Sequence, residues 1–195
     1  VGGNDEGSQF DAHIRQSRFR ITTDTPADNG DSIKGVLELD FIVTEGGNER
    51  ISNSYQPRVR HAYIEYKNWL IGQTWTTFMD VPSLPESLDF IGITDGITFG
   101  RQTMVRYTSG GFQVALENPE TTVTPFGGGG RIVADDNALP DLIATYTMQQ
   151  NWGYVKVAGM ARQLSYDDGE SVDDDETSFG IAVSGKVMLN NGDDI

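Results

Sequence analysis

The chain has no cysteine among its 195 residues, and this absence excludes several kinds of site. Without thiols there is no disulfide framework, no thiolate-ligated metal and no cysteine nucleophile. Basic residues are also scarce, since 14 lysines and arginines stand against 29 aspartates and glutamates and leave a net charge of −15. So acidic a chain without a basic tract is disfavoured on phosphate backbones, and we expect no nucleic-acid partner.

Long hydrophobic runs are missing as well. No stretch reaches the roughly 18 apolar residues that a membrane-spanning helix needs. The N-terminal sequence VGGNDEGSQF lacks the basic and apolar regions of a signal peptide, so we expect a protein that is either not exported or processed or cut at this end. Glycine is abundant instead: 23 residues exceed the usual share of about 7%. This composition is typical of a chain made of strands and turns.

Apolar and polar residues alternate in nine segments, which predicts nine β-strands. We expect the strands at residues 14–25, 33–44, 57–66, 69–75, 101–108, 112–118, 140–148, 153–164 and 177–189. Short connections at 26–32, 67–68, 109–111 and 149–152 take turns with long ones at 45–56, 76–100, 119–139 and 165–176. This parity is typical of outer-membrane barrels, which have short periplasmic turns and long external loops. A β-sandwich has no reason to keep it.

The segment RQTMVRYTSGGFQVALENPE, residues 101–120, is a predicted β-hairpin that can face its surroundings in two ways. One face would carry Val105, Tyr107, Phe112, Val114 and Leu116, and the other Arg106, Gln113 and Glu117. In a soluble domain the apolar face packs inward against another layer. In a transmembrane barrel it faces lipid, and the polar face lines a water-filled lumen. The hairpin alone does not decide between them, but the loop parity favours the barrel.

Charged residues share one face of several predicted strands. Arg18 and Arg20 alternate with apolar residues, as do Glu38 and Asp40 on the next strand. In a barrel these side chains would line the lumen, with arginines facing carboxylates, whereas in a soluble sheet they would form an ordinary solvated surface. The residues that we expect to line a pore are Arg18, Arg20, Glu38, Asp40, Arg58, Arg60, Arg106, Gln113 and Glu117.

The longest connection, TTFMDVPSLPESLDFIGITDGITFG at residues 76–100, mixes apolar and acidic side chains. A loop that projects into water has no need of so many apolar residues, while one folded into a barrel can pack them against the wall. The alternative is a loop with a small core of its own. We expect a constriction loop whose carboxylates face the arginines of the wall. These carboxylates are Asp80, Glu86, Asp89 and Asp95.

Three motifs that suggest chemistry lack the context that it requires. Residues 180–187, GIAVSGKV, nearly match a phosphate-binding loop, but Val187 replaces the Ser or Thr that holds magnesium and the segment alternates like a strand. His13 and His61 are the only histidines, and no ligand cluster surrounds them. The acidic stretch 165–176 does not fit an EF-hand, so a solvated external loop is preferred, although cation binding stays open. We therefore expect no catalytic residue, cofactor or metal site.

Three segments resemble the DcaP-like porins of Gram-negative outer membranes: SRFRITTDTPADNGDSIKGVLELDF, RVRHAYIEYKNWLIGQTWTTFMD and VRYTSGGFQVALENPET. The resemblance is most specific over residues 14–120 and continues in register to residue 189. It implies a 16-stranded trimeric porin for small anionic solutes, dicarboxylates among them, narrowed by its third external loop. It also implies that one strand precedes Val1 and about six follow Ile195, so that residues 76–100 are that loop.

The alternation, the loop parity and the resemblance together predict an all-β, antiparallel, up-and-down transmembrane barrel, of which residues 1–195 form a partial domain. The expected function is passive diffusion of small hydrophilic, anionic solutes through the bacterial outer membrane, without catalysis. The expected partners are outer-membrane lipid, lipopolysaccharide, these solutes and the other copies of a homotrimer. The alternative is a soluble secreted β-sandwich that binds carbohydrate. A jelly-roll hydrolase ranks third and would require two carboxylates about 5 to 10 Å apart in a cleft.

Overall fold

The computed structural model describes residues 10, 12–42, 55–84 and 98–188. The large sheet consists of β1 (Phe19–Pro26), β2 (Ser32–Asp40), β3 (Arg58–Tyr66), β4 (Trp69–Trp75), β5 (Arg101–Ser109), β6 (Phe112–Glu117), β9 (Asp141–Gln150), β10 (Gly153–Asp167) and β11 (Asp173–Val187). A separate hairpin consists of β7 (Thr121–Val123) and β8 (Ile132–Ala134), and a 3-10 turn, η1, spans Val81–Ser83. No helix in this part of the chain is long and apolar enough to cross a membrane.

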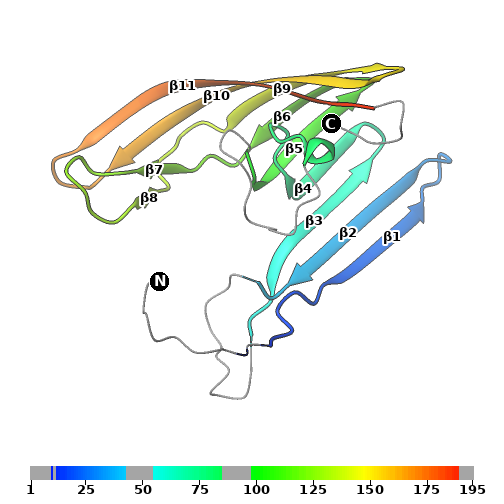
Figure 1. The fold of residues 1–195 in the computed structure, drawn as a ribbon, viewed down its shortest axis with the longest axis horizontal. Helices are drawn as coiled ribbons and strands as arrows, with labels where there is room; N and C mark the ends of the chain where they lie inside the picture. The colour runs from blue at the N-terminus through cyan, green and yellow to red at the C-terminus, as the bar shows by residue number, and fades with distance from the viewer. Residues whose placement is uncertain (1–9, 11, 43–54, 85–97, 189–195) are drawn as a thin grey trace.

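The nine strands of the large sheet follow one another in chain order, and each is antiparallel to its neighbours. The sheet is curved, with β1 and β11 at opposite margins of the molecule (Figure 1). Within the described residues each of these two strands pairs on one side only. The predicted all-β, antiparallel, up-and-down arrangement of nine strands is confirmed, including a strand in place of a phosphate-binding loop at 180–187.

The outer, convex face of this sheet is apolar and exposed, because alternate residues of every strand point to it. Its exposed side chains include Phe19, Ile21, Leu37, Ile64, Ile71, Val105, Tyr107, Phe112, Leu116, Leu142, Tyr146, Val157, Phe179, Ile181 and Val183. On β6 the alternate residues Ala115 and Glu117 are buried on the concave side, whereas the edge strand β1 is exposed along its whole length. In the described part of the chain the other sheet is the two-stranded β7–β8 hairpin, so the nine strands form one layer and not one of the two large facing sheets that the β-sandwich alternative requires.

Several predicted strand boundaries are wrong, and the expected strand at 33–44 already ends at Asp40. The expected strand at 14–25 starts late, because the Ser17 N–H donates to the Ile14 carbonyl at 2.9 Å and forms a turn before β1. At the other end, pairing between β10 and β11 continues to Asp167 and Asp173, so the expected loop at 165–176 shrinks to residues 168–172. The Asp168 carboxylate closes this turn by accepting the backbone N–H groups of residues 170–172.

The connection from β6 to β9 has more structure than the alternation predicted. It contains the β7–β8 hairpin, and it lies against the part of β10 that no longer pairs with β9, after Ala161. Arg162 of β10 donates to the Glu120 carbonyl at 2.8 Å, and the Ser165 N–H donates to the Thr121 hydroxyl at 3.2 Å. The Asn137 amide donates to the Gln163 carbonyl. These contacts brace the long β10–β11 hairpin on one side.

One glycine of the sheet is required by its backbone. Gly72 of β4 has φ +130°, which lies in the left-handed half of conformational space that residues with a Cβ rarely adopt. An added Cβ would also lie 2.2 Å from the Ala62 carbonyl oxygen and 2.6 Å from the Tyr63 Cα of β3. Only glycine therefore allows β3 and β4 to approach at this position without strain.

We expect Gly72→Ala to destabilise the folded protein by at least about 1 kcal/mol, because the new methyl group meets both an unfavourable φ and a backbone atom. Thermal unfolding of the full-length protein in detergent, followed by circular dichroism, measures the change. Gly100→Ala is the matched control, since a Cβ at Gly100 meets no atom within 4 Å. Equal melting temperatures for the two variants would contradict the prediction.

Candidate functional site

The concave face carries a cluster of arginines and carboxylates where β1, β2 and β3 lie side by side. The register pairs Glu38 of β2 with Arg20 of β1, and Asp40 of β2 with Arg58 of β3. The pairing with β3 shifts between Glu38 and Leu39, so β3 contains an extra residue, Arg60. Such a β-bulge re-aims side chains, and here it brings Arg60 onto the two carboxylates of β2.

The cluster is held together by charge-assisted hydrogen bonds. Arg58 donates from Nε and Nη2 to the two oxygens of Asp40 at 2.9 and 2.8 Å. Arg60 bridges the carboxylates, from Nε to Glu38 at 2.8 Å and from Nη1 to Asp40 at 2.9 Å. Arg18 and Arg20 reach Glu38 at 3.4 and 3.3 Å. Four guanidinium groups therefore surround two carboxylates, and the cluster has an excess of two positive charges.

A further guanidinium lies next to this cluster. The Cζ atom of Arg101 lies 3.8 Å from the centroid of the Trp75 ring, and that of Arg60 lies 5.9 Å from the same centroid. Two nitrogens of Arg101, Nε and Nη2, are buried without a hydrogen-bond partner in the described residues. Strict alternation would place Arg101 and Trp75 with the apolar face, which is why sequence reasoning missed them.

The other predicted pore-lining residues form a second group, on β5 and β6. Arg106 and Gln113 are half-buried, and Gln113 accepts a hydrogen bond from the Thr145 hydroxyl at 3.4 Å. Glu117 is buried, and its carboxylate accepts the backbone N–H of Thr77 at 2.7 Å. The nine predicted residues thus lie in two groups on the concave face, and the first six are connected by ion pairs.

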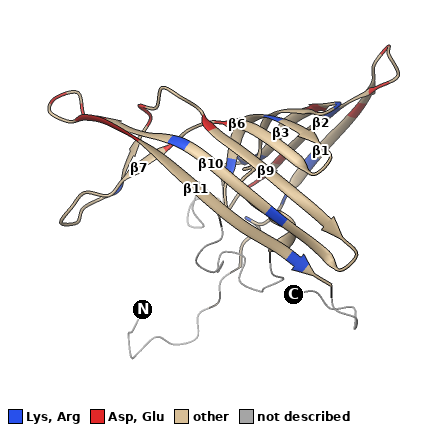
Figure 2. Cartoon of the chain, turned by 90° about the horizontal axis from the view of Figure 1, so that it is seen from above, with Lys and Arg blue, Asp and Glu red and all other residues tan. Residues whose placement is uncertain are grey.

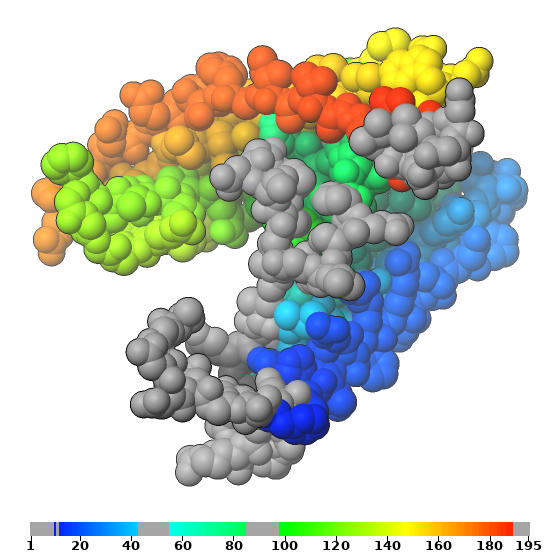
Figure 3. Space-filling view, viewed as in Figure 1, coloured from blue at the N-terminus to red at the C-terminus, as the bar shows by residue number. Residues whose placement is uncertain are grey.

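The start of the expected constriction loop, residues 76–84, lies inside the curve of the sheet. Thr76, Thr77 and Met79 are buried, and η1 contacts β11. Asp80 does not face the arginines of the first group: its carboxylate accepts hydrogen bonds from Tyr154 of β10 and Ser184 of β11. Glu86, Asp89 and Asp95 lie outside the described residues. In the space-filling view, the concave side lies between the blue strands β1 and β2 and the orange and red strands β10 and β11 (Figure 3).

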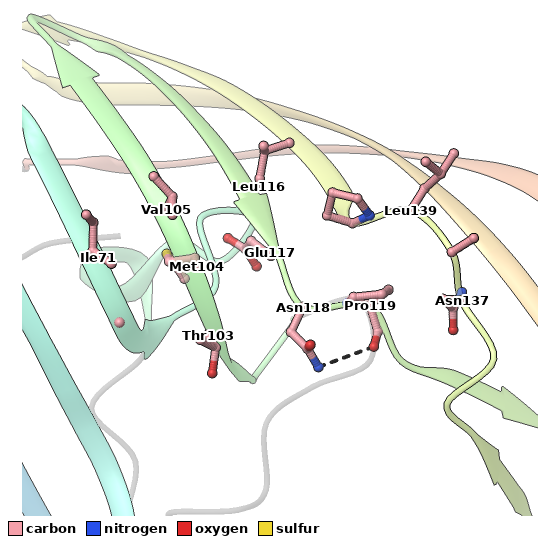
Figure 4. Close-up of a pocket in the computed structure, with 13 residues that line it drawn as sticks. Ile71, Thr103, Met104, Val105, Leu116, Glu117, Asn118, Pro119, Asn137 and Leu139 are labelled. Carbon is pink, nitrogen blue, oxygen red and sulfur yellow. Dashed lines mark hydrogen bonds between the residues drawn. The ribbon is translucent and has the colours of Figure 1, made fainter.

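A pocket of about 460 Å³ lies away from these charged groups (Figure 4). Its apolar lining includes Ile71, Val105 and Leu116 of the exposed face, together with Leu139 from the connection before β9. Glu117 also borders it, but its carboxylate bonds to Thr77 on the concave side. The pocket brings no further titratable group to the site.

The acidic stretch does not form a metal site in the described residues. No group of three or more His, Asp or Glu side chains in these ranges is arranged to hold an ion. Asp173, Asp174, Asp175 and Glu176 lie on β11, in the part of the hairpin that extends past β9. Acidic residues gather where β10 and β11 join (Figure 2). Hydrogen bonds from the backbone N–H groups of Val172, Ser171 and Glu170 lower the pKa of Asp168 to about 2.

Two comparisons with known proteins indicate the same family. The family model described as DcaP outer membrane protein matches residues 4–195. A comparison with curated proteins finds no match. The crystal structure of the outer membrane channel DcaP of Acinetobacter baumannii is similar to this chain, with a TM-score of 0.74 and 25% sequence identity. The alignment covers 96% of this chain and 51% of that one, so the chain spans about half the length of the solved channel.

We expect Asp40→Asn to destabilise the folded protein by about 3 kcal/mol, because it leaves Arg60 buried with one carboxylate fewer. Asp40 is fully buried and accepts three guanidinium hydrogen bonds. The unfolding midpoint in urea, measured on the full-length protein in lipid vesicles, gives the change. Asp28→Asn, in an exposed turn, should leave the midpoint unchanged, and an equal shift in both variants would count against the ion-pair cluster.

We expect the turn at residues 168–172 to loosen in acid. Since the pKa of Asp168 is lowered to about 2, its contribution to stability is present above the ordinary value of 3.8 and is lost as pH falls toward 2. Hydrogen exchange of the Ser171 and Val172 amides, measured by NMR across this range, should show the loss. Asp168→Asn should remove the pH step, and a step that persists in this variant would refute the assignment.

Proposed function

This chain is a bacterial outer-membrane protein of the DcaP family, and from that premise we propose that it forms part of a passive diffusion channel for small hydrophilic, anionic solutes. The observation that carries the proposal is the inverted sheet. Its exposed face is apolar, while its charged side chains lie on the concave face. An exposed apolar surface of this extent is typical of contact with lipid, and the polar concave face is typical of a water-filled lumen.

We propose that the nine strands belong to a closed 16-stranded barrel, assembled as a homotrimer in contact with outer-membrane lipid and lipopolysaccharide. The up-and-down order and the curvature of the sheet support closure. The solved channel is about twice as long as this chain, which leaves room for the further strands. In such a barrel, residues 76–84 would begin the constriction loop on the inner side of the wall. We propose no catalytic role for any of these residues.

Anion preference is supported by where the charges lie and not by their sum. The net charge of −15 includes the acidic residues of the β10–β11 hairpin, which extend beyond the sheet. Permeation depends instead on the potential in the narrow passage, where low-dielectric walls focus the field of nearby side chains. The cluster on β1–β3 has an excess of positive charge, and guanidinium groups bind carboxylates in a two-pronged geometry. Small carboxylates therefore fit this face.

We expect the full-length protein in a planar bilayer to show an anion-selective reversal potential in a salt gradient. The double variant Arg18→Gln, Arg20→Gln should lose this preference, because it removes the excess of two positive charges around Glu38 and Asp40. The two side chains are 43% and 52% exposed, so their replacement is compatible with folding. Arg131→Gln, at an exposed position between β7 and β8, is the control and should leave the reversal potential unchanged. Cation preference in the unmodified protein would overturn the proposal.

A further inference from the structure

Residues 76–84 cross the concave face of the sheet and do not run beside the neighbouring strand. The segment leaves β4 and reaches β10 and β11, which lie four and five strands further along the sheet. It makes hydrogen bonds to Glu117 of β6, Lys156 of β10 and Ser184 of β11. The segment is thus tied to strands two to five positions further along the sheet by contacts that span 40 to 104 positions in sequence.

Two buried charges hold the backbone of this segment. The Lys156 ammonium donates to the Thr77 carbonyl at 3.0 Å and to the Met79 carbonyl at 2.6 Å. The Glu117 carboxylate accepts the Thr77 N–H at 2.7 Å. Lys156 is 8% exposed and Glu117 is 2% exposed. A charged side chain buried to this degree needs hydrogen-bond partners, and the main chain at residues 77–79 supplies them.

A second anchor lies one residue further along. The Asp80 carboxylate accepts a hydrogen bond from the Ser184 hydroxyl at 2.6 Å, and the Tyr154 hydroxyl lies 3.1 Å from both of its oxygens. This anchor uses a side chain of the segment itself. The first anchor consists of the hydrogen bonds that Lys156 and Glu117 make to the backbone of residues 77–79. Lys156 and Glu117 are therefore the only side chains that form it.

We propose that Lys156 and Glu117 are positioning residues of the channel, which fix residues 76–84 across the passage and thereby set its width. This inference rests on the proposed function. Neither residue needs to contact a solute to act in this way. Lys156 is distinct from the arginine cluster, because both of its hydrogen-bond partners in the structure are carbonyls of the segment.

The test uses a thiol reporter, since the 195 residues contain no cysteine. Met79→Cys places one thiol at a position that is 4% exposed. In this background we expect Lys156→Met to raise the rate of maleimide labelling at least tenfold and to increase single-channel conductance in a planar bilayer. Lys67→Met, in the exposed β3–β4 turn, is the matched control and should change neither quantity.

A second variant guards against a general loss of folding. Glu117→Gln keeps the size and an acceptor oxygen, and we expect it to raise labelling about threefold while the heat-modifiable gel mobility of the folded protein is retained. Unchanged labelling and conductance in folded Lys156→Met protein would overturn the inference. Labelling needs no channel activity, so a protein that does not conduct but shows the tenfold increase would support the anchor and reject the proposed function.

Discussion

The structure depends on one continuous backbone hydrogen-bond ladder that separates two environments. In lipid no solvent pairs with an exposed N–H or C=O group, so a spanning sheet must satisfy these groups between its own strands. The antiparallel pairing does this for the strands between β1 and β11, and the two-residue period of the strands then sends apolar and polar side chains to opposite faces. A slip by one residue would exchange the faces of a strand, so register and environment are fixed together.

The bulge in β3 interrupts this two-residue alternation at one point and brings charged side chains together. The extra residue, Arg60, reaches both carboxylates of β2 and is itself buried. In surroundings of low dielectric constant, such a network is stable only when each charge keeps its partners. This network lies on β1–β3, at the other end of the sheet from the strands that carry Lys156 and the Asp80 contacts.

Much of the fold and of the facing of the side chains could be predicted from the sequence, because the alternation of a strand is visible in its own residues. Alternation at 101–117 was enough to place Val105 and Leu116 outside and Glu117 inside. The boundary errors have local causes too: an acidic stretch predicts a loop, yet Asp173 and its neighbours lie on a strand in the part of the hairpin beyond β9. Three features depend on contacts between different strands or segments: the bulge in β3, the position of Arg101, and the hydrogen bonds of Lys156 to residues 77–79. No periodic pattern contains them, although alternation across 153–164 could have put Lys156 on the polar face.

The long β10–β11 hairpin has a consequence for how the protein meets its surroundings. Beyond the last pair with β9, at Ala161 and Leu142, β10 continues for six residues to Asp167. At about 3.3 Å per residue this ribbon projects by roughly 20 Å, and the connection before β9 stiffens it. This end of the sheet is therefore a narrow, negatively charged projection of two strands, and a peptide inserted at residues 169–171 would lie at its tip.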